Sequence, residues 1–435
     1  MVLLEEARLA KNKAISASYE ATRVKRAGQV AKTFELKITT NKLSKRQSEA
    51  LTRLFLEAKW VYNHILSLDS ITDFDDKLTA VPVKIPDGSL DLRDLKVIGS
   101  QQKQSVFTGV KRSVKGLAAL KKNGHKVGKL KFKHEYNSIE LKQAGTTYKI
   151  KGNSIKVQNI TGWLTVRGAH QLKDWDLASA KIVKRPSGYY LLVTAYKEPE
   201  PDDFAQGTIV GIDWGLASQL TLTSGEKVSI AIGESDRLRR LRRKLNRQVK
   251  GSNGSKRTRR LIRLECERQA RYKDEVANQL SSQILKHEVI VIQDDDFSSW
   301  SKSTASGGSV ISAGVLGRVK SILSRSARCI VIPRFEKTTQ TCVCGNLNKL
   351  ELNERVYSCA CGYTADRDTH SSEMMIRFAL KYTGGEPARA LVESVLDEGL
   401  FSQRALKLET SKFKDSRLKV VRSAQSEASG SSAQM

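Results

Sequence analysis

The chain has 435 residues, of which 75 are Lys or Arg and 46 are Asp or Glu, so its formal net charge at pH 7 is +29. This length allows about two to four packed units with at least one large core. A positive surplus of this size favours a polyanionic partner, and a folded chain suits structured nucleic acid better than a membrane patch. The composition therefore argues against a small metabolic enzyme.

The sequence contains no apolar run long enough to span a membrane, which would take about 18 residues. Its first ten residues, MVLLEEARLA, carry acids where a signal peptide needs a basic flank and an apolar stretch. We therefore expect a cytoplasmic protein with no membrane partner.

The N-terminal half begins with helical and strand patterns. The first thirty residues are basic and predict a helix, and Thr33–Thr39 alternates like a strand. Apolar residues at intervals of three and four predict a helix over residues 44–66. After a polar, turn-rich segment, residues 101–123 predict a second helix, whose expected buried face is Val106, Val110, Val114, Leu117 and Leu120.

From residue 129 to 197 the pattern changes to short alternating runs bounded by Gly, Asn, Ser or Pro. The runs are LKFKH, SIELK, YKIK, SIKVQ, WLTVRG, AKIVKR and YYLLVTAY. Regularly spaced short strands of this kind predict a β-barrel or sandwich.

The second half predicts an α/β unit. It opens with the apolar strand before Asp213 and continues with a hairpin over residues 220–229, a long basic helix pair and buried strands at 289–292 and 329–333. A helix is expected over residues 369–382. The Ser/Ala/Gln-rich residues 421–435 are expected to be disordered.

Carboxylates follow the apolar strands of this second unit. Asp213 ends one strand, and the cluster Gln293-Asp294-Asp295 ends another. Two strand ends rich in Asp are what an RNase H-like nuclease needs to hold two divalent metal ions. Because strand side chains alternate, Gln293 and Asp295 should share a face if the chain stays extended. The alternatives are a turn-capping Asp213 and a solvated acidic loop.

A third pair of acids, Asp366 and Asp368, lies at the start of the last predicted helix. Asp366 suits a helix N-cap. Asp368 would have to point back toward the two strand ends to join a shared metal site.

Four of the six cysteines lie within twenty residues, in two matching Cys-x-Cys-Gly knuckles separated by fourteen residues. This pairing predicts a four-thiolate structural zinc ribbon formed by Cys342, Cys344, Cys359 and Cys361. The spacing departs from the usual two residues between the paired cysteines, so a metal-free site is the alternative. Cys266 and Cys329 are isolated and are expected to be core residues.

The segment 237–263 carries thirteen Lys or Arg and no acid. A solvated helix face normally mixes both signs, so this run predicts a track for nucleic-acid phosphates. The residues expected to bind are Arg239, Arg240, Arg243, Lys256, Arg259 and Arg260.

The order of these motifs resembles one known family. GIDWG, KGSNGSK, VIVIQDDDF and TTQTC…CG…CACGYTADRD occur in turn, and ELKITTNKLSKRQ…EAKWVYNHIL precedes them. The pattern is similar to that of TnpB, the transposon-encoded RNA-guided nuclease related to type V CRISPR effectors. The resemblance covers about residues 33–385.

The resemblance implies a multidomain α+β protein. Its parts would be an N-terminal extension with the first wedge strand (1–43), a helical recognition lobe (44–126) and a wedge β-barrel (127–203). A RuvC nuclease domain of RNase H-like fold would follow (204–336 and 365–385), interrupted by a zinc-ribbon target-binding module (337–364). The tail (386–435) would be partly disordered, and its removal is expected to leave cutting intact.

The resemblance also implies a guide RNA, a double-stranded DNA target and cleavage beside a short flanking motif. Two catalytic Mg²⁺ ions would be bound by Asp213, Asp368 and a third acid. The family usually has Glu-Asp-Leu where this chain has Gln293-Asp294-Asp295, so Asp295 is the expected substitute, with Asp294 the second choice. Asp366 would be an accessory acid.

Three residues of the helix predicted over residues 44–66, Lys59, Tyr62 and Asn63, are further candidates for nucleic-acid contact, although Tyr62 equally suits helix packing. We expect a prokaryotic protein that works as a monomer on one RNA and is nucleoid-associated when bound to DNA. The alternatives are a nuclease-dead RNA-guided DNA-binding repressor, a type V effector that uses a CRISPR RNA, and an actin-like ATPase with a similar GIDWG motif.

Overall fold

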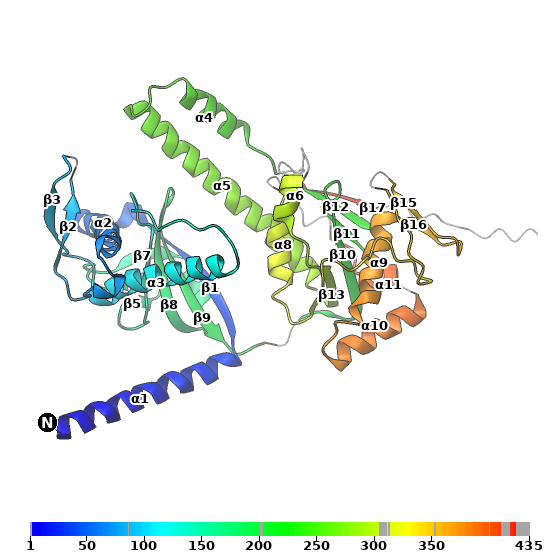
Figure 1. Cartoon of the computed structure of the whole chain (residues 1–435), viewed down its shortest axis with the longest axis horizontal. Coiled ribbons are helices and arrows are strands. Elements are labelled where there is room, and N and C mark those ends of the chain that lie inside the picture. Colours follow the sequence, from blue (N-terminus) through cyan, green and yellow to red (C-terminus); the bar gives the residue numbers. More distant parts are fainter. Residues whose placement is uncertain are drawn as a thin grey trace, which may run out of the picture. The chain divides into compact units, whose positions relative to one another are not determined.

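The structure is a computed structural model that describes residues 2–85, 87–200, 203–230, 232–303, 311, 314–351, 354–399, 401–409 and 418–422. It divides into two compact units, residues 1–201 and 202–435 (Figure 1). Each has its own sheet and its own apolar core.

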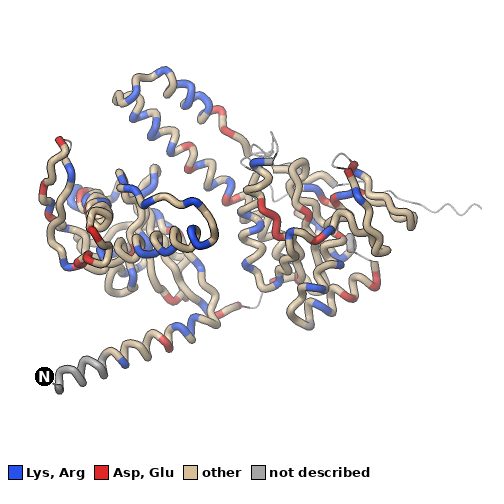
Figure 2. Tube along the Cα trace, in the orientation of Figure 1, with Lys and Arg blue, Asp and Glu red and all other residues tan. Residues whose placement is uncertain are grey.

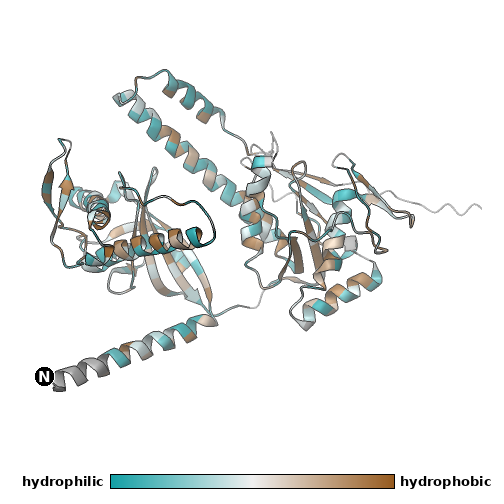
Figure 3. Ribbon diagram, viewed as in Figure 1, coloured by the Kyte–Doolittle hydropathy of each residue, from teal (hydrophilic) through white to brown (hydrophobic). Residues whose placement is uncertain are grey.

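A seven-stranded antiparallel sheet forms the centre of the first unit, in the order β4-β8-β9-β1-β7-β6-β5. Alternate residues of its strands are apolar, so one face of the sheet is buried and forms most of the core (Figure 3). The strands are β1 (Val30–Ile38), β4 (Ser138–Leu141), β5 (Tyr148–Lys151), β6 (Ser154–Val157), β7 (Leu164–Arg167), β8 (Asp176–Arg185) and β9 (Gly188–Lys197).

Three helices and a hairpin accompany this sheet: α1 (Val2–Ala27), α2 (Lys45–Ser67), α3 (Ser100–Lys122), and β2 (Ala80–Lys84) paired with β3 (Leu90–Asp94). Ser44 and Gln47 form a capping box that fixes the start of α2. The buried carboxylate of Glu57 accepts backbone N–H bonds of 2.8 to 2.9 Å from residues 96–98, which ties α2 to the chain before α3. Short 3₁₀ turns cover residues 40–42, 71–73 and 169–172.

A mixed six-stranded sheet forms the second unit, in the order β14-β13-β10-β11-β12-β17. The central strand β10 runs parallel to β13, and β13 runs parallel to β14, whereas β10, β11, β12 and β17 pair antiparallel. The strands are β10 (Ala205–Trp214), β11 (Leu220–Leu222), β12 (Glu226–Ile230), β13 (His287–Gln293), β14 (Cys329–Ile332) and β17 (Leu418–Arg422).

Helices cover both faces of this sheet. One apolar cluster contains residues of α5 and α8 on one face, and another contains residues of α9 and α10 on the other. The helices are α4 (Asp236–Asn246), α5 (Asn253–Ile284), α6 (Phe297–Ser303), α8 (Leu316–Leu323), α9 (Arg367–Ala379), α10 (Glu386–Glu398) and α11 (Phe401–Arg404). A small hairpin, β15 (Val356–Ser358) with β16 (Thr364–Asp366), precedes α9.

Several expectations from the sequence are wrong. The run LKFKH at residues 130–134 is not a strand, because it pairs with no neighbouring strand among the described residues. Val114 and Leu120 of the expected buried face of α3 are exposed. The turn-rich segment after α2 contains the β2–β3 hairpin, which its polar composition concealed.

The C-terminal tail also differs from expectation. Val421 and Arg422, placed in the expected disordered segment, belong to β17, which pairs with β12. The remaining residues of that segment, 423–435, lie outside the described part of the chain. Cys266 is exposed on α5 rather than buried, because it points away from the apolar cluster, whereas Cys329 packs against that cluster. No helix in the described ranges has the length and apolar character needed to cross a membrane.

Candidate active site

The first two acidic strand ends of the sequence lie side by side. The parallel strands β10 and β13 pair with Ile212 level with Ile292, so Asp213 and Gln293 follow at neighbouring positions. The indole Nε1 of Trp214 donates to the carbonyl oxygen of Gln293 at 3.2 Å. The carboxyl ends of adjacent parallel strands meet at one edge of a sheet, which is a common place for a functional site.

Helix α9 brings the third acid to this edge. It packs so closely on β10 that a Cβ added at Gly211 would lie 2.1 Å from the carbonyl oxygen of Ser372. Asp366 is the N-cap of α9 and accepts a hydrogen bond from the backbone N–H of Thr369 at 3.1 Å. Asp368 lies in the first turn, and Ser371 one turn later donates its hydroxyl to Asp213 Oδ1 at 3.0 Å.

The electrostatics of Asp213 show that the acids act on one another. Burial raises the pKa of Asp213 to about 8, and the negative charges of Asp368 and Asp295 add to this effect. The hydrogen bond from Ser371 and the charge of Arg367 oppose it. The negative charges of Asp295, which follows β13, and of Asp368, in the first turn of α9, thus both reach Asp213 at the end of β10.

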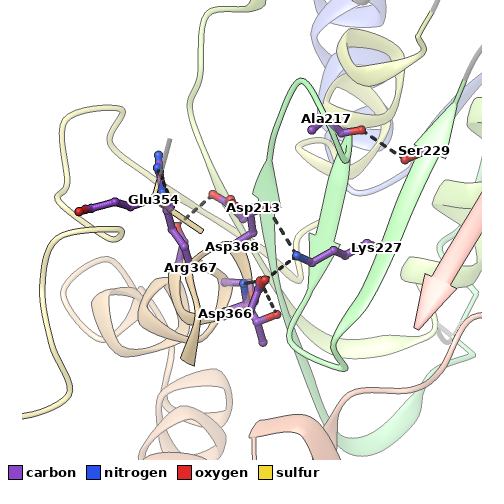
Figure 4. A network of polar contacts seen from close by, with 11 residues as sticks. Asp213, Ala217, Lys227, Ser229, Glu354, Asp366, Arg367 and Asp368 are labelled. Atoms are coloured by element: carbon purple, nitrogen blue, oxygen red, sulfur yellow. Dashed lines mark hydrogen bonds and ion pairs between the residues drawn. The ribbon is translucent and has the colours of Figure 1, made fainter. Parts of the chain in front are cut away.

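One cation, Lys227 on β12, lies beside two of the acids (Figure 4). Its Nζ is 2.8 Å from Asp366 Oδ2 and 3.8 Å from Asp368 Oδ2. The Arg367 guanidinium instead donates to the backbone carbonyls of Glu351 and Glu354, each at 3.0 Å. Asp366 is thus held both by its cap and by Lys227, which together lower its pKa despite partial burial.

Gln293 has a structural role at this edge. Its side chain is 7% exposed, and its amide Nε2 donates to the carbonyl oxygens of Pro333, Arg334 and Glu336 at 3.3, 3.0 and 3.0 Å. A carboxylate could not donate these bonds. The glutamine therefore fixes the chain that leaves β14.

Asp294 and Asp295 are in different environments. Asp294 forms an ion pair with Lys320 of α8 at 2.7 Å, whereas Asp295 is half-buried and contributes to the raised pKa of Asp213. The extended chain ends at Gln293, because the N–H of Asp295 donates back to the Gln293 carbonyl at 2.9 Å. The strand alternation used in the sequence analysis therefore does not extend to Asp295.

The four clustered cysteines converge. The Sγ–Sγ distance is 3.7 Å both between Cys342 and Cys361 and between Cys344 and Cys359, and all four sulfurs lie within 4.8 Å of one another. A regular tetrahedron with Zn–S bonds of about 2.3 Å has sulfurs about 3.8 Å apart, so the site fits zinc. Among the described residues, this is the one group of three or more His, Cys, Asp or Glu side chains whose ligand atoms converge to hold an ion.

The two knuckles have the same backbone geometry. The N–H of Gly345 donates to the Cys342 carbonyl at 2.9 Å, and the N–H of Gly362 donates to the Cys359 carbonyl at 3.0 Å. The glycines have φ values of 90° and 87°, a left-handed conformation that favours glycine. This repeated turn is why a single residue between the cysteines suffices to bring the sulfurs together.

The cysteine module is joined to α9 through His370. The ring of this buried residue stacks on Tyr357 of β15 with centroids 3.8 Å apart, and its Nε2 lies 2.9 Å from the carbonyl oxygen of Thr341, next to Cys342. His370 is flanked on α9 by Asp368 and Ser371. The module and the acidic site therefore share one helix turn.

The predicted phosphate track lies on α4 and α5 (Figure 2). The six residues named for it, Arg239, Arg240, Arg243, Lys256, Arg259 and Arg260, are all exposed. Those on α4 line a hollow of about 360 Å³ together with Asp236. The buried carboxylate of Glu265 on α5 accepts bonds from Ser235 and Arg268 and so fixes the start of α4.

The three candidates on α2 have different surroundings. Tyr62 is 6% exposed within the core of the first unit, so its ring is not available to nucleic acid. Asn63 exchanges two hydrogen bonds with the backbone of Lys133, at 2.8 and 3.0 Å. Lys59 is half-buried and lines a cavity of about 510 Å³. The assignment of Tyr62 to binding is thus corrected to a packing role.

Sequence reasoning missed the residues that support the acids, namely Lys227, Lys320, Arg334 and Ser371. The lysines and arginine reach the site from distant parts of the chain, and no motif marks them. Ser371 could have been identified from the sequence, because it follows Asp368 by three residues and both therefore lie on one side of a helix.

Comparison with known proteins agrees with this arrangement. Residues 322–375, which contain the cysteine module and the start of α9, match the family model described as "Cas12f1-like, TNB domain". Two curated proteins named "Putative RNA-guided DNA endonuclease" are similar, one from Streptomyces pristinaespiralis (27% identity over 206 residues) and InsQ from Escherichia coli K12 (29% over 169 residues). These matches support the resemblance to the TnpB family that was inferred from the motifs.

The matched regions are partial. They cover 45% and 38% of this chain, and 48% and 41% of the two relatives, so the chain spans less than half the length of either. Among solved structures, a cryo-EM structure of a Cas12f1–sgRNA–target DNA complex aligns with 80% of this chain and 99% of its own, with a TM-score of 0.44 and 10% identity. A CRISPR-Cas12f ternary complex aligns with 76% of this chain and 81% of its own at a TM-score of 0.26 and 12% identity.

Proposed function

We propose that this protein is an RNA-guided DNA endonuclease that cleaves double-stranded DNA beside a short flanking motif. The observation that carries the proposal is the group of carboxylates at one sheet edge, in which Asp213 is affected by both Asp295 and Asp368. The similarity to proteins named as RNA-guided DNA endonucleases supports the same reaction. The chain acts as a monomer on one guide RNA in the prokaryotic cytoplasm and joins the nucleoid when it binds DNA.

The carboxylates at the sheet edge have the ligand chemistry that divalent cations need, although their oxygens do not converge as closely as the four cysteine sulfurs. Carboxylate oxygens are the ligands that Mg²⁺ prefers, and the negative charges of Asp368 and Asp295 add to the burial that raises the pKa of Asp213. Asp213, Asp295 and Asp368 would hold two Mg²⁺ ions, which when bound supply an activated water and stabilise the leaving 3′ oxygen. Asp294 and Asp366 are accessory, since Lys320 and Lys227 respectively neutralise them.

The chain's own residues prepare this site. Ser371 holds the Asp213 carboxylate in one orientation. Lys227 limits the repulsion around Asp368. Helix α9 can carry its acid close to β10 because Gly211 has no side chain.

The remaining parts are assigned to nucleic-acid binding. Residues 1–43 and 127–203 form the N-terminal extension and wedge, 44–126 the recognition lobe, 204–336 and 365–385 the RuvC domain, and 337–364 a target-binding zinc ribbon. The division of the chain after residue 201 supports a separate wedge and recognition unit. The exposed Lys and Arg side chains of α4 and α5 bind phosphates of the guide RNA or the target DNA.

A second function, RNA-guided DNA binding without cleavage, is favoured by one observation. Gln293 stands where relatives in the family usually have a glutamate, and its amide is fully used in holding the chain after β14. A protein of this kind would occupy DNA as a repressor. It needs the same guide and the same basic track.

The test is expression with the native flanking DNA, sequencing of the RNA that copurifies, and incubation with matching duplex DNA in Mg²⁺. We expect guide-dependent cleavage that Asp213→Ala abolishes while binding is retained. Tight guide-dependent binding by the unaltered protein without cleavage would establish the repressor instead. Absence of any retained RNA would reject both.

A further inference from the structure

The loop Pro333–Glu336, which leads from β14 toward the cysteine module, presents an aromatic ring to solvent. Phe335 is 86% exposed, more than any other large apolar side chain in the described residues. Such exposure is unfavourable in water, and an aromatic face of this kind is the surface on which the bases of single-stranded nucleic acid stack.

The loop that carries Phe335 is fixed on both sides. Gln293 donates to the carbonyls of Pro333, Arg334 and Glu336. The carboxylate of Glu336 accepts a hydrogen bond from the hydroxyl of Tyr382 and lies 3.6 Å from the ammonium of Lys381. Phe335 is therefore held out on an ordered backbone, and little conformational entropy is lost when something stacks on it.

The neighbouring Arg334 connects this loop to the acidic site. Its guanidinium lies 5.6 Å from the centroid of the Phe335 ring and donates to Ser299 Oγ at 3.2 Å. Gln293, whose amide contacts the Arg334 carbonyl at 3.0 Å, lies beside Asp213 at the ends of the parallel strands β13 and β10. An aromatic face and a guanidinium thus lie together at the margin of the carboxylate group.

We propose that Phe335 and Arg334 hold the single DNA strand that enters the acidic site, with a base stacked on Phe335 and a phosphate at Arg334. An aromatic face with an adjacent cation is the chemistry that binds single-stranded nucleic acid without sequence preference. Gln293 is the positioning residue, because it sets the loop in place. The inference rests on the proposed nuclease function, for which it supplies the substrate contact.

The test uses the full-length protein with its copurified RNA and a single-stranded 20-nucleotide DNA containing 5-iodouracil. Ultraviolet crosslinking followed by mass spectrometry is expected to find the crosslink on Phe335. Phe335→Leu keeps an apolar side chain but removes the stacking face, so the crosslink should disappear and DNA affinity should fall about 5- to 150-fold. Phe335→Trp should retain both, and Arg334→Gln should weaken binding while the Phe335 crosslink persists.

Crosslinks found only elsewhere, or an affinity of Phe335→Leu within twofold of the parent, would overturn the inference. Guided cleavage of duplex DNA, measured in parallel, separates this outcome from failure of the proposed function. Cleavage without a Phe335 crosslink would reject the strand contact and keep the nuclease. A Phe335 crosslink without guided cleavage would keep the contact and reject the nuclease.

Discussion

At the scale of single residues, Gln293 and Asp213 lie at neighbouring positions on two strands but have different roles. Gln293 fixes the chain after β14, and Asp213 supplies a carboxyl group to the candidate site. The Gln293 amide contacts three backbone carbonyls, whereas burial and the negative charges of Asp368 and Asp295 raise the pKa of Asp213 to about 8. Both positions were evident from the sequence as polar residues ending apolar strands. Their roles were not, because those depend on the loop after β14 and on α9.

Restoring the glutamate usual in the family is expected to damage this protein. Gln293→Glu would direct a carboxylate at three carbonyl oxygens and remove their donor, so we expect a loss of about 1–3 kcal/mol in the free energy of unfolding. Urea denaturation measures it, with Gln403→Glu, a change at an exposed position of α11, as the control. Equal stability of Gln293→Glu and the parent would show that the amide does not hold the loop.

The raised pKa of Asp213 predicts a pH dependence of stability in magnesium-free buffer. The folded protein keeps this proton up to about pH 8, whereas the unfolded chain loses it near pH 4. Stability is therefore lost as pH rises between those values, by at most about 1.4 kcal/mol per pH unit for this group. Asp213→Asn has no such proton to lose.

We therefore expect Asp213→Asn to be increasingly more stable than the parent from pH 5 to pH 8, with the difference levelling off above pH 8. Denaturant unfolding of both proteins at each pH measures this difference. A stability difference independent of pH would contradict the assigned pKa.

At the scale of elements, α9 joins the cysteine module to the acidic site. The Cys-x-Cys-Gly pairing was visible in the sequence, since each knuckle is local. The stacking of His370 on Tyr357 was not, because it joins a helix to a hairpin through side chains with no motif of their own. Asp366 was correctly predicted to be the N-cap of α9, although the helix was predicted to begin at residue 369, two residues late.

The cysteine module is expected to bind one zinc ion per chain, because its sulfur distances match a tetrahedral site. Cys344→Ser should lower the zinc content and expose the module to limited proteolysis. Cys266→Ser, which alters an exposed cysteine outside the module, should leave both unchanged. Full zinc content in Cys344→Ser would show that the metal is bound elsewhere.

At the scale of the whole molecule, composition indicated a polyanionic partner, and the alternating patterns indicated a β-rich unit followed by an α/β unit. The prediction that residues 421–435 are disordered was wrong for Val421 and Arg422. They belong to β17, which is short and pairs with β12, about 190 residues earlier in the chain. Helix α10 also contributes Val392 and Val395 to a core shared with β10, β13 and α9. These pairings depend on long-range contacts that no local pattern reveals.

The tail is therefore expected to be needed, contrary to the expectation from sequence. A chain ending at Thr383 lacks α10 and β17, so we expect its second unit to lose about 3 kcal/mol or more of stability. A chain ending at Arg422 retains every element the structure describes and should unfold like the parent. Thermal unfolding compares them, and an unchanged transition for the shorter chain would contradict this assignment.

The central claim is that Asp213, Asp295 and Asp368 form one metal-dependent cutting site. The most direct test is single-turnover cleavage of guide-matched DNA in Mg²⁺ by Asp295→Ala and, as its matched neighbour, Asp294→Ala. We expect Asp295→Ala to lower the rate at least about 100-fold, because Asp295 acts on Asp213. Asp294→Ala should cut within a few-fold of the parent, because Asp294 is paired with Lys320. Parental cutting by Asp295→Ala together with loss of cutting in Asp294→Ala would contradict the site.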